Sequence, residues 1–158
     1  MRSAKALPCT MLFIFLVLSN TPVEAQDKSP EGATSYVPSL GDMMAATQLR
    51  HSKLFYAGKL KNWPLADYEL GQLSMNLKQV VRFYPAVPGR DLAGLDKAAI
   101  LIDESIKAMD DGKFEKAFTQ MTAECNSCHD AAGRPFIYVR RPTFPSPYSN
   151  QVFAPRKR

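Results

Sequence analysis

Four stripes of apolar side chains occupy the middle of this chain, and each advances by alternating steps of three and four residues. That spacing follows one face of a helix with about 3.6 residues per turn, whereas a strand requires a period of two. The stripes predict helices over residues 39–61, 64–84, 91–109 and 113–132. Because short connections join helices of similar length, we expect an all-α fold, an antiparallel four-helix bundle around one shared core.

Short breaks rich in proline, glycine, asparagine and aspartate separate the predicted helices. Asn62 precedes Pro64 and suits the N-cap position of the second helix. A tight turn is expected at residues 110–112, and Gly133 is expected to end the fourth helix.

The first 25 residues are typical of a secretory signal peptide. The apolar run at 11–18 is too short to span a bilayer and follows Arg2 and Lys5. Cleavage is expected after Ala25, with an uncleaved membrane anchor as the alternative. We therefore expect a periplasmic protein without stable membrane insertion after cleavage.

The chain has three cysteines, an odd number that excludes a complete set of disulfides within one molecule. Cys9 belongs to the predicted signal peptide, so its removal leaves Cys125 and Cys128. Both lie on the apolar stripe of the fourth predicted helix, so both are expected to face the inside of the bundle.

Two non-helical segments flank the bundle, a polar leader at 26–38 and a basic tail at 133–158 that is rich in proline and aromatic residues. The tail carries six Lys and Arg residues and no acidic residue. Proline excludes regular helix there, so we expect an extended arm that packs its aromatic rings on the bundle, with partner binding as the alternative. An exported protein is not expected to bind nucleic acid, and the charge of the tail favours an acidic protein partner or an anionic membrane surface.

The strongest chemical motif is C-x-x-C-H at residues 125–129. In an exported chain it indicates covalent attachment of one heme c. Cys125 and Cys128 lie three residues apart on a helix and can add to the two vinyl groups of a porphyrin, while His129 offers an imidazole to the iron. A redox-active disulfide would suit a thioredoxin-like α/β fold, and a zinc site would need further ligands at regular spacing.

At this motif the chain resembles the cytochrome c′ family, the class II c-type cytochromes, over residues 39–132. The resemblance rests on the motif and on the segment KFEKAFTQMTAECNSCHDAAG, which places it near the end of the last helix. It implies that Cys125 and Cys128 form the thioethers, that His129 is the proximal iron ligand, and that a homodimer is an open alternative. The tail departs from the family pattern, in which the chain ends soon after the heme helix.

The sixth iron ligand is left open by the sequence. His51 lies on the inner stripe of the first predicted helix and is one candidate. The resemblance implies two others. Arg50 would pair with a heme propionate while Leu54 caps an open iron site, or Met44 would bind the iron as in low-spin relatives.

These candidates separate two functions. A heme with two protein ligands suits a one-electron carrier that meets redox partner proteins, whereas a five-coordinate heme suits a protein that binds nitric oxide or carbon monoxide. An enzyme is not expected, because no second histidine clusters near a carboxylate in the heme region.

Overall fold

The computed structural model describes residues 36–88, 91–148 and 150–156. The predicted signal peptide and most of the predicted leader lie outside these residues. The described chain contains four helices, α1 (Leu40–Lys59), α2 (Trp63–Phe83), α3 (Ala93–Lys107) and α4 (Asp111–Ala131). No strand occurs among the described residues, so the predicted all-α class is confirmed.

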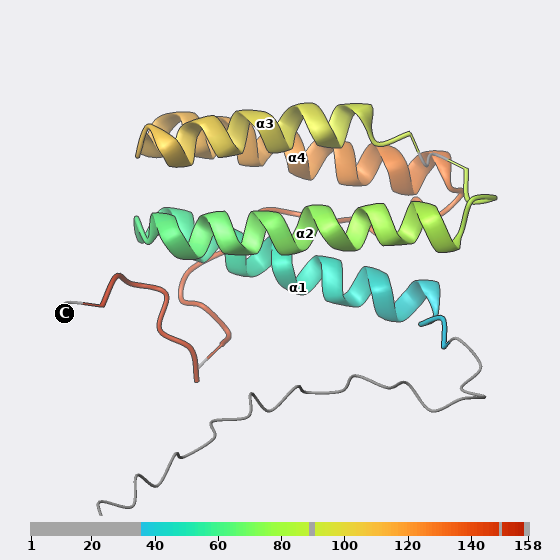
Figure 1. The fold of residues 1–158 in the computed structure, drawn as a ribbon, viewed down its shortest axis with the longest axis horizontal. Helices are drawn as coiled ribbons and strands as arrows, with labels where there is room; N and C mark the ends of the chain where they lie inside the picture. Colours follow the sequence, from blue (N-terminus) through green and yellow to red (C-terminus); the bar gives the residue numbers. More distant parts are fainter. Residues whose placement is uncertain (1–35, 89–90, 149, 157–158) are drawn as a thin grey trace, which may run out of the picture. The chain divides into compact units, whose positions relative to one another are not determined.

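The helices form a bundle in which neighbours in sequence pack side by side (Figure 1). α1 packs most extensively on α2, and α3 on α4, so the bundle consists of two helical pairs. The short connections reverse the chain direction at each step, which gives the predicted antiparallel arrangement and places the end of α4 beside the beginning of α1. In the described part of the chain, no helix has the length and apolar character needed to cross a membrane.

Side-chain caps fix where three of the helices begin. Ser39 accepts a hydrogen bond from the amide of Asp42, at 3.1 Å, and Asn62 accepts one from Leu65, at 3.4 Å, as expected for the predicted cap. Asp110 caps α4 through the amide of Lys113.

The predicted turn at 110–112 is misplaced, because Asp110 acts as a cap and Gly112 already lies within α4. The chain instead turns just before Asp110, where Met109 adopts the left-handed conformation with φ of 52°.

The largest fully buried aromatic side chains of the hydrophobic core lie at the end of the bundle where α1 ends and α4 begins. Leu54, Phe114 and Phe118 are fully buried there, and the Phe118 ring packs on Phe114 and on Phe55 of α1. Gly58 allows α1 to approach this cluster, because a Cβ atom at that position would lie 2.1 Å from the Phe114 ring. The opposite end of the bundle, where α1 begins and α4 ends, is lined differently and holds the candidate site.

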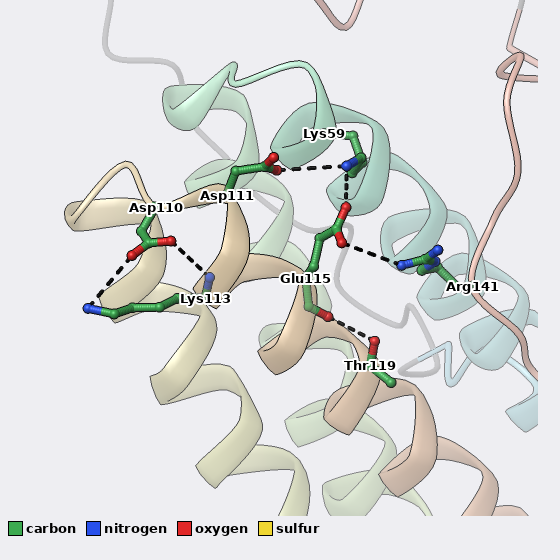
Figure 2. A network of polar contacts seen from close by, with 7 residues as sticks. All are labelled: Lys59, Asp110, Asp111, Lys113, Glu115, Thr119 and Arg141. Atoms are coloured by element: carbon green, nitrogen blue, oxygen red, sulfur yellow. Dashed lines mark hydrogen bonds and ion pairs between the residues drawn. The ribbon is translucent and has the colours of Figure 1, made fainter.

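The tail runs back along the bundle from the end of α4 towards the core end (Figure 1). The hydroxyl of Tyr56 donates a hydrogen bond to the carbonyl of Thr143, at 2.7 Å, and the Phe153 ring is only 4% exposed beside Tyr56. Figure 2 shows Glu115 of α4 between Lys59 of α1 and Arg141 of the tail.

The tail aromatics divide into two groups. Phe144, Tyr148 and Phe153 pack on the bundle, as expected for a covering arm. Phe136 and Tyr138 are each 77% exposed, so the expectation does not hold for them.

Candidate heme-binding site

A cavity of about 440 Å³ opens at the end of the bundle opposite the core. Its volume falls within the roughly 300–1,000 Å³ usual for cofactor and small-molecule sites. All four helices and the tail contribute to its walls, and most of the lining side chains are apolar. The lining residues are Leu40, Gly41, Met44, Ala45, Thr47, Gln48, His51, Leu73, Leu77, Val80, Val81, Tyr84, Val87, Leu92, Leu95, Cys125, Cys128, His129, Ala132, Arg134, Ile137 and Val139.

The two motif cysteines lie in the last turns of α4 and both line this cavity. Burial, with a smaller contribution from the neighbouring Cys128, raises the pKa of the Cys125 thiol to about 11. Burial also raises the pKa of Cys128. Both sulfurs are therefore protonated thiols at neutral pH, which is the form whose S–H can add across a vinyl double bond without an oxidant.

His129 also lines the cavity, and its imidazole is held by the tail. Its Nδ1 atom lies 2.8 Å from the carbonyl oxygen of Ile137. A carbonyl only accepts, so Nδ1 carries the proton and donates, and Nε2 keeps its lone pair. Histidines that bind metals characteristically make such a bond with the other ring nitrogen.

His51 is 3% exposed and lines the cavity from α1. Its Nε2 lies 2.9 Å from the Thr122 hydroxyl, and its ring packs on Phe118 with centroids 4.5 Å apart. The Thr122 hydroxyl donates its proton to the Phe118 carbonyl, so it accepts from Nε2–H of His51, whose lone pair then lies on Nδ1. Burial lowers the pKa of His51 to about 4, so the imidazole is neutral at pH 7.

Helix register indicates which residue of α1 lies opposite His129. His51 meets Thr122, and α1 and α4 run antiparallel. Met44 precedes His51 by seven residues, as Thr122 precedes His129, so Met44 and His129 lie at about the same level. His51 lies two helical turns from that level, roughly 10 Å along the axis of α1. Met44 also lines the cavity.

The other two predicted site residues lie elsewhere. The Arg50 guanidinium is 3.0 Å from the carboxylate of Glu69, a side chain only 2% exposed, and it already has a charged partner there. Leu54 is fully buried in the core cluster and is not among the residues that line the cavity. The site thus gathers Cys125, Cys128, His129 and His51, but neither Arg50 nor Leu54.

Sequence reasoning missed the contribution of the tail to this site. Arg134, Ile137 and Val139 line the cavity. The Asn126 side chain inside the motif pairs with the backbone of Val139 through two hydrogen bonds of 2.8 Å. In the sequence, aliphatic Ile137 and Val139 alternate with aromatic Phe136 and Tyr138, which indicates a segment with one buried face. The pattern does not tell which helix that face contacts.

Among the described residues, no group of three or more His, Cys, Asp or Glu side chains is arranged to hold a metal ion. A heme iron receives four ligands from its porphyrin and needs only one or two from the protein. Comparisons of the chain with protein-family models, curated proteins and solved structures gave no match.

Proposed function

We propose that this protein is a periplasmic monoheme c-type cytochrome that carries one electron at a time. The observation that carries the proposal is the coincidence of the C-x-x-C-H motif with a large, mostly apolar cavity at one end of the bundle. A cofactor site of this kind needs an apolar enclosure with a few polar groups placed to fix orientation. The cavity and the motif together supply both.

The residues along the cavity fit a heme. Cys125 and Cys128 would hold it through thioethers, and His129 would offer Nε2 to the iron. The bound group would supply a metal centre that changes oxidation state by one electron. The protein would orient it with the thioethers and exclude water with the apolar walls.

Electron transfer is favoured over gas binding by the position of Met44. A second protein ligand would occupy the position at the iron that a diatomic gas needs, so a site that offers one favours electron transfer. Met44 lies level with His129 on the facing helix, as this role requires. For His51 to take the role, its imidazole would have to leave Thr122, because Nε2 is already used there.

The proposed partners are redox proteins with acidic docking surfaces. The tail carries six basic residues without an acidic one, whereas residues 26–132 have a net charge of −2. Attraction between such surfaces raises the association rate and weakens with salt, because exposed charges are screened within about 8 Å at physiological ionic strength.

Absorption and electron paramagnetic resonance of the ferric protein test the proposal. Mass spectrometry should first show one covalently bound heme on the mature chain. We expect a low-spin spectrum that becomes high-spin in Met44→Leu, because leucine has no ligand atom. Met43→Leu is the matched control, since Met43 is buried beside it but is not among the cavity-lining residues.

Each other outcome has a definite meaning. A low-spin spectrum lost in His51→Ala but kept in Met44→Leu would make His51 the sixth ligand and retain the electron carrier. A high-spin wild-type spectrum would favour the protein that binds nitric oxide or carbon monoxide. Absence of covalent heme from the exported protein would overturn the proposal.

A further inference from the structure

The end of α4 turns the chain back over the heme motif. Gly133 has a φ of 68°, its amide bonds the Asp130 carbonyl, and the amide of Arg134 bonds the His129 carbonyl at 2.8 Å. This pair of hydrogen bonds around a left-handed glycine is the Schellman motif. It stops the helix and sends residues 134–139, here called the covering segment, back along α4.

The covering segment is fixed to α4 at two further points. The amide group of Asn126 donates to the Val139 carbonyl and accepts from the Val139 N–H, both at 2.8 Å. The Asn126 side chain therefore pairs with the segment as a neighbouring strand would. Between the Schellman motif and this pair, the Ile137 carbonyl accepts the Nδ1–H of His129.

The side chains of the segment point in two directions. Val139 and Ile137, the latter 42% exposed, line the cavity, whereas Phe136 and Tyr138 are each 77% exposed and do not line it. The segment is therefore one wall of the cavity as well as the acceptor for His129.

We propose that the covering segment, locked by Asn126, is a built-in part of the heme site that sets the strength of the iron–His129 bond. A carbonyl that accepts from Nδ1–H makes the imidazole a stronger electron donor through Nε2. A stronger donor stabilises ferric over ferrous iron and lowers the reduction potential. Asn126 is the positioning residue, because it holds the segment, and with it the Ile137 carbonyl, in place. This inference rests on the proposed heme function.

The test compares Asn126→Ala with Ser127→Ala in the full mature protein carrying its heme. Ser127 is the other variable residue of the motif and is exposed, so its substitution is the matched control. Alanine favours helix at both positions, which preserves α4. Mass spectrometry measures heme attachment, an electrode measures the reduction potential, and hydrogen exchange measures protection of the Val139 amide.

We expect heme to be attached in all three proteins. In Asn126→Ala the Val139 amide should exchange faster by on the order of tenfold, and the potential should shift to more positive values. Ser127→Ala should change neither quantity.

If the Val139 amide exchanges faster in Asn126→Ala but the reduction potential is unchanged, the inference is overturned while the heme function stays intact. An unprotected Val139 amide in the wild-type protein would overturn it as well. Failure of the wild-type protein to carry heme would overturn the proposed function, and the tuning role with it, whatever the state of the Val139 amide.

Discussion

His51 lies where a positive charge would be costly. It is almost fully buried between Thr122 and Phe118, and burial lowers its pKa from 6.5 to about 4. In the unfolded chain the same imidazole takes up a proton near pH 6.5. Between these two values the unfolded state binds more protons, so the stability of the fold falls as the pH falls.

We predict a loss of roughly 3 kcal/mol in the free energy of unfolding between pH 7 and pH 4 from this residue alone. Urea unfolding of the wild-type protein and of His51→Gln, at several pH values, measures it. Glutamine can still donate to Thr122 but does not titrate, so the variant should lack this pH-dependent loss of stability. Parallel curves would show that His51 does not carry this dependence.

The sequence was informative about residues whose role is local. The spacing of Cys125, Cys128 and His129 is complete within five positions, so their shared placement on the cavity followed from helix periodicity. The partners of Arg50 and Asn126 could not be predicted, because Glu69 and Val139 reach them only through the packing of other elements.

At the scale of elements, the tail packs on the bundle as an additional element of the fold. Phe153 is almost fully buried against Tyr56 and Tyr148, near the end of a segment without regular secondary structure. Tyr56, Phe55 and Lys53 of α1 all contact tail residues.

We predict that Phe153→Ala lowers the free energy of unfolding by about 3–5 kcal/mol, as truncation of a buried phenylalanine does elsewhere. Phe136→Ala, in the same tail but on an exposed ring, should change it by less than about 0.5 kcal/mol. Chemical denaturation of both variants measures the difference. A loss in Phe153→Ala as small as that in Phe136→Ala would show that the tail is not part of the cooperative fold.

Helix boundaries were predictable to within a few residues, because proline, glycine and capping side chains mark them. The one misplaced turn arose because an Asp-Asp-Gly run suits both a turn and a capped helix start. The hydrogen bond that the Asp110 side chain accepts from the Lys113 amide shows that this run forms a capped helix start. The path of the tail could not be predicted, since proline excludes helix but does not select a packing surface.

The two ends of the bundle differ in how they are filled. One end, here called the solid end, holds buried aromatic side chains, and the other, here called the hollow end, contains the cavity. The largest fully buried aromatic side chains lie where α1 ends and α4 begins, and the cavity lies where α1 begins and α4 ends. A large cavity removes packing contacts from the side chains around it. Stability of the hollow end therefore depends on what fills it.

We predict that the double variant Cys125→Ala/Cys128→Ala, which cannot attach heme, keeps its helical circular dichroism but binds the dye ANS and unfolds at a lower temperature. The solid end retains the helices, while the hollow end loses fixed packing and exposes apolar surface. Dye fluorescence and thermal unfolding, compared with the wild-type protein, measure this. Identical dye binding and melting would show that the cavity is stable without a bound group.

The return of the tail over α4 also means that the motif and the segment that covers it are synthesised one after the other. A chain is synthesised from its N-terminus, so the C-x-x-C-H motif emerges before the covering segment that closes beside it. Until residues 134–139 fold back, the two thiols are accessible from that side. The segment that forms this wall of the cavity is thus made after the motif that it covers.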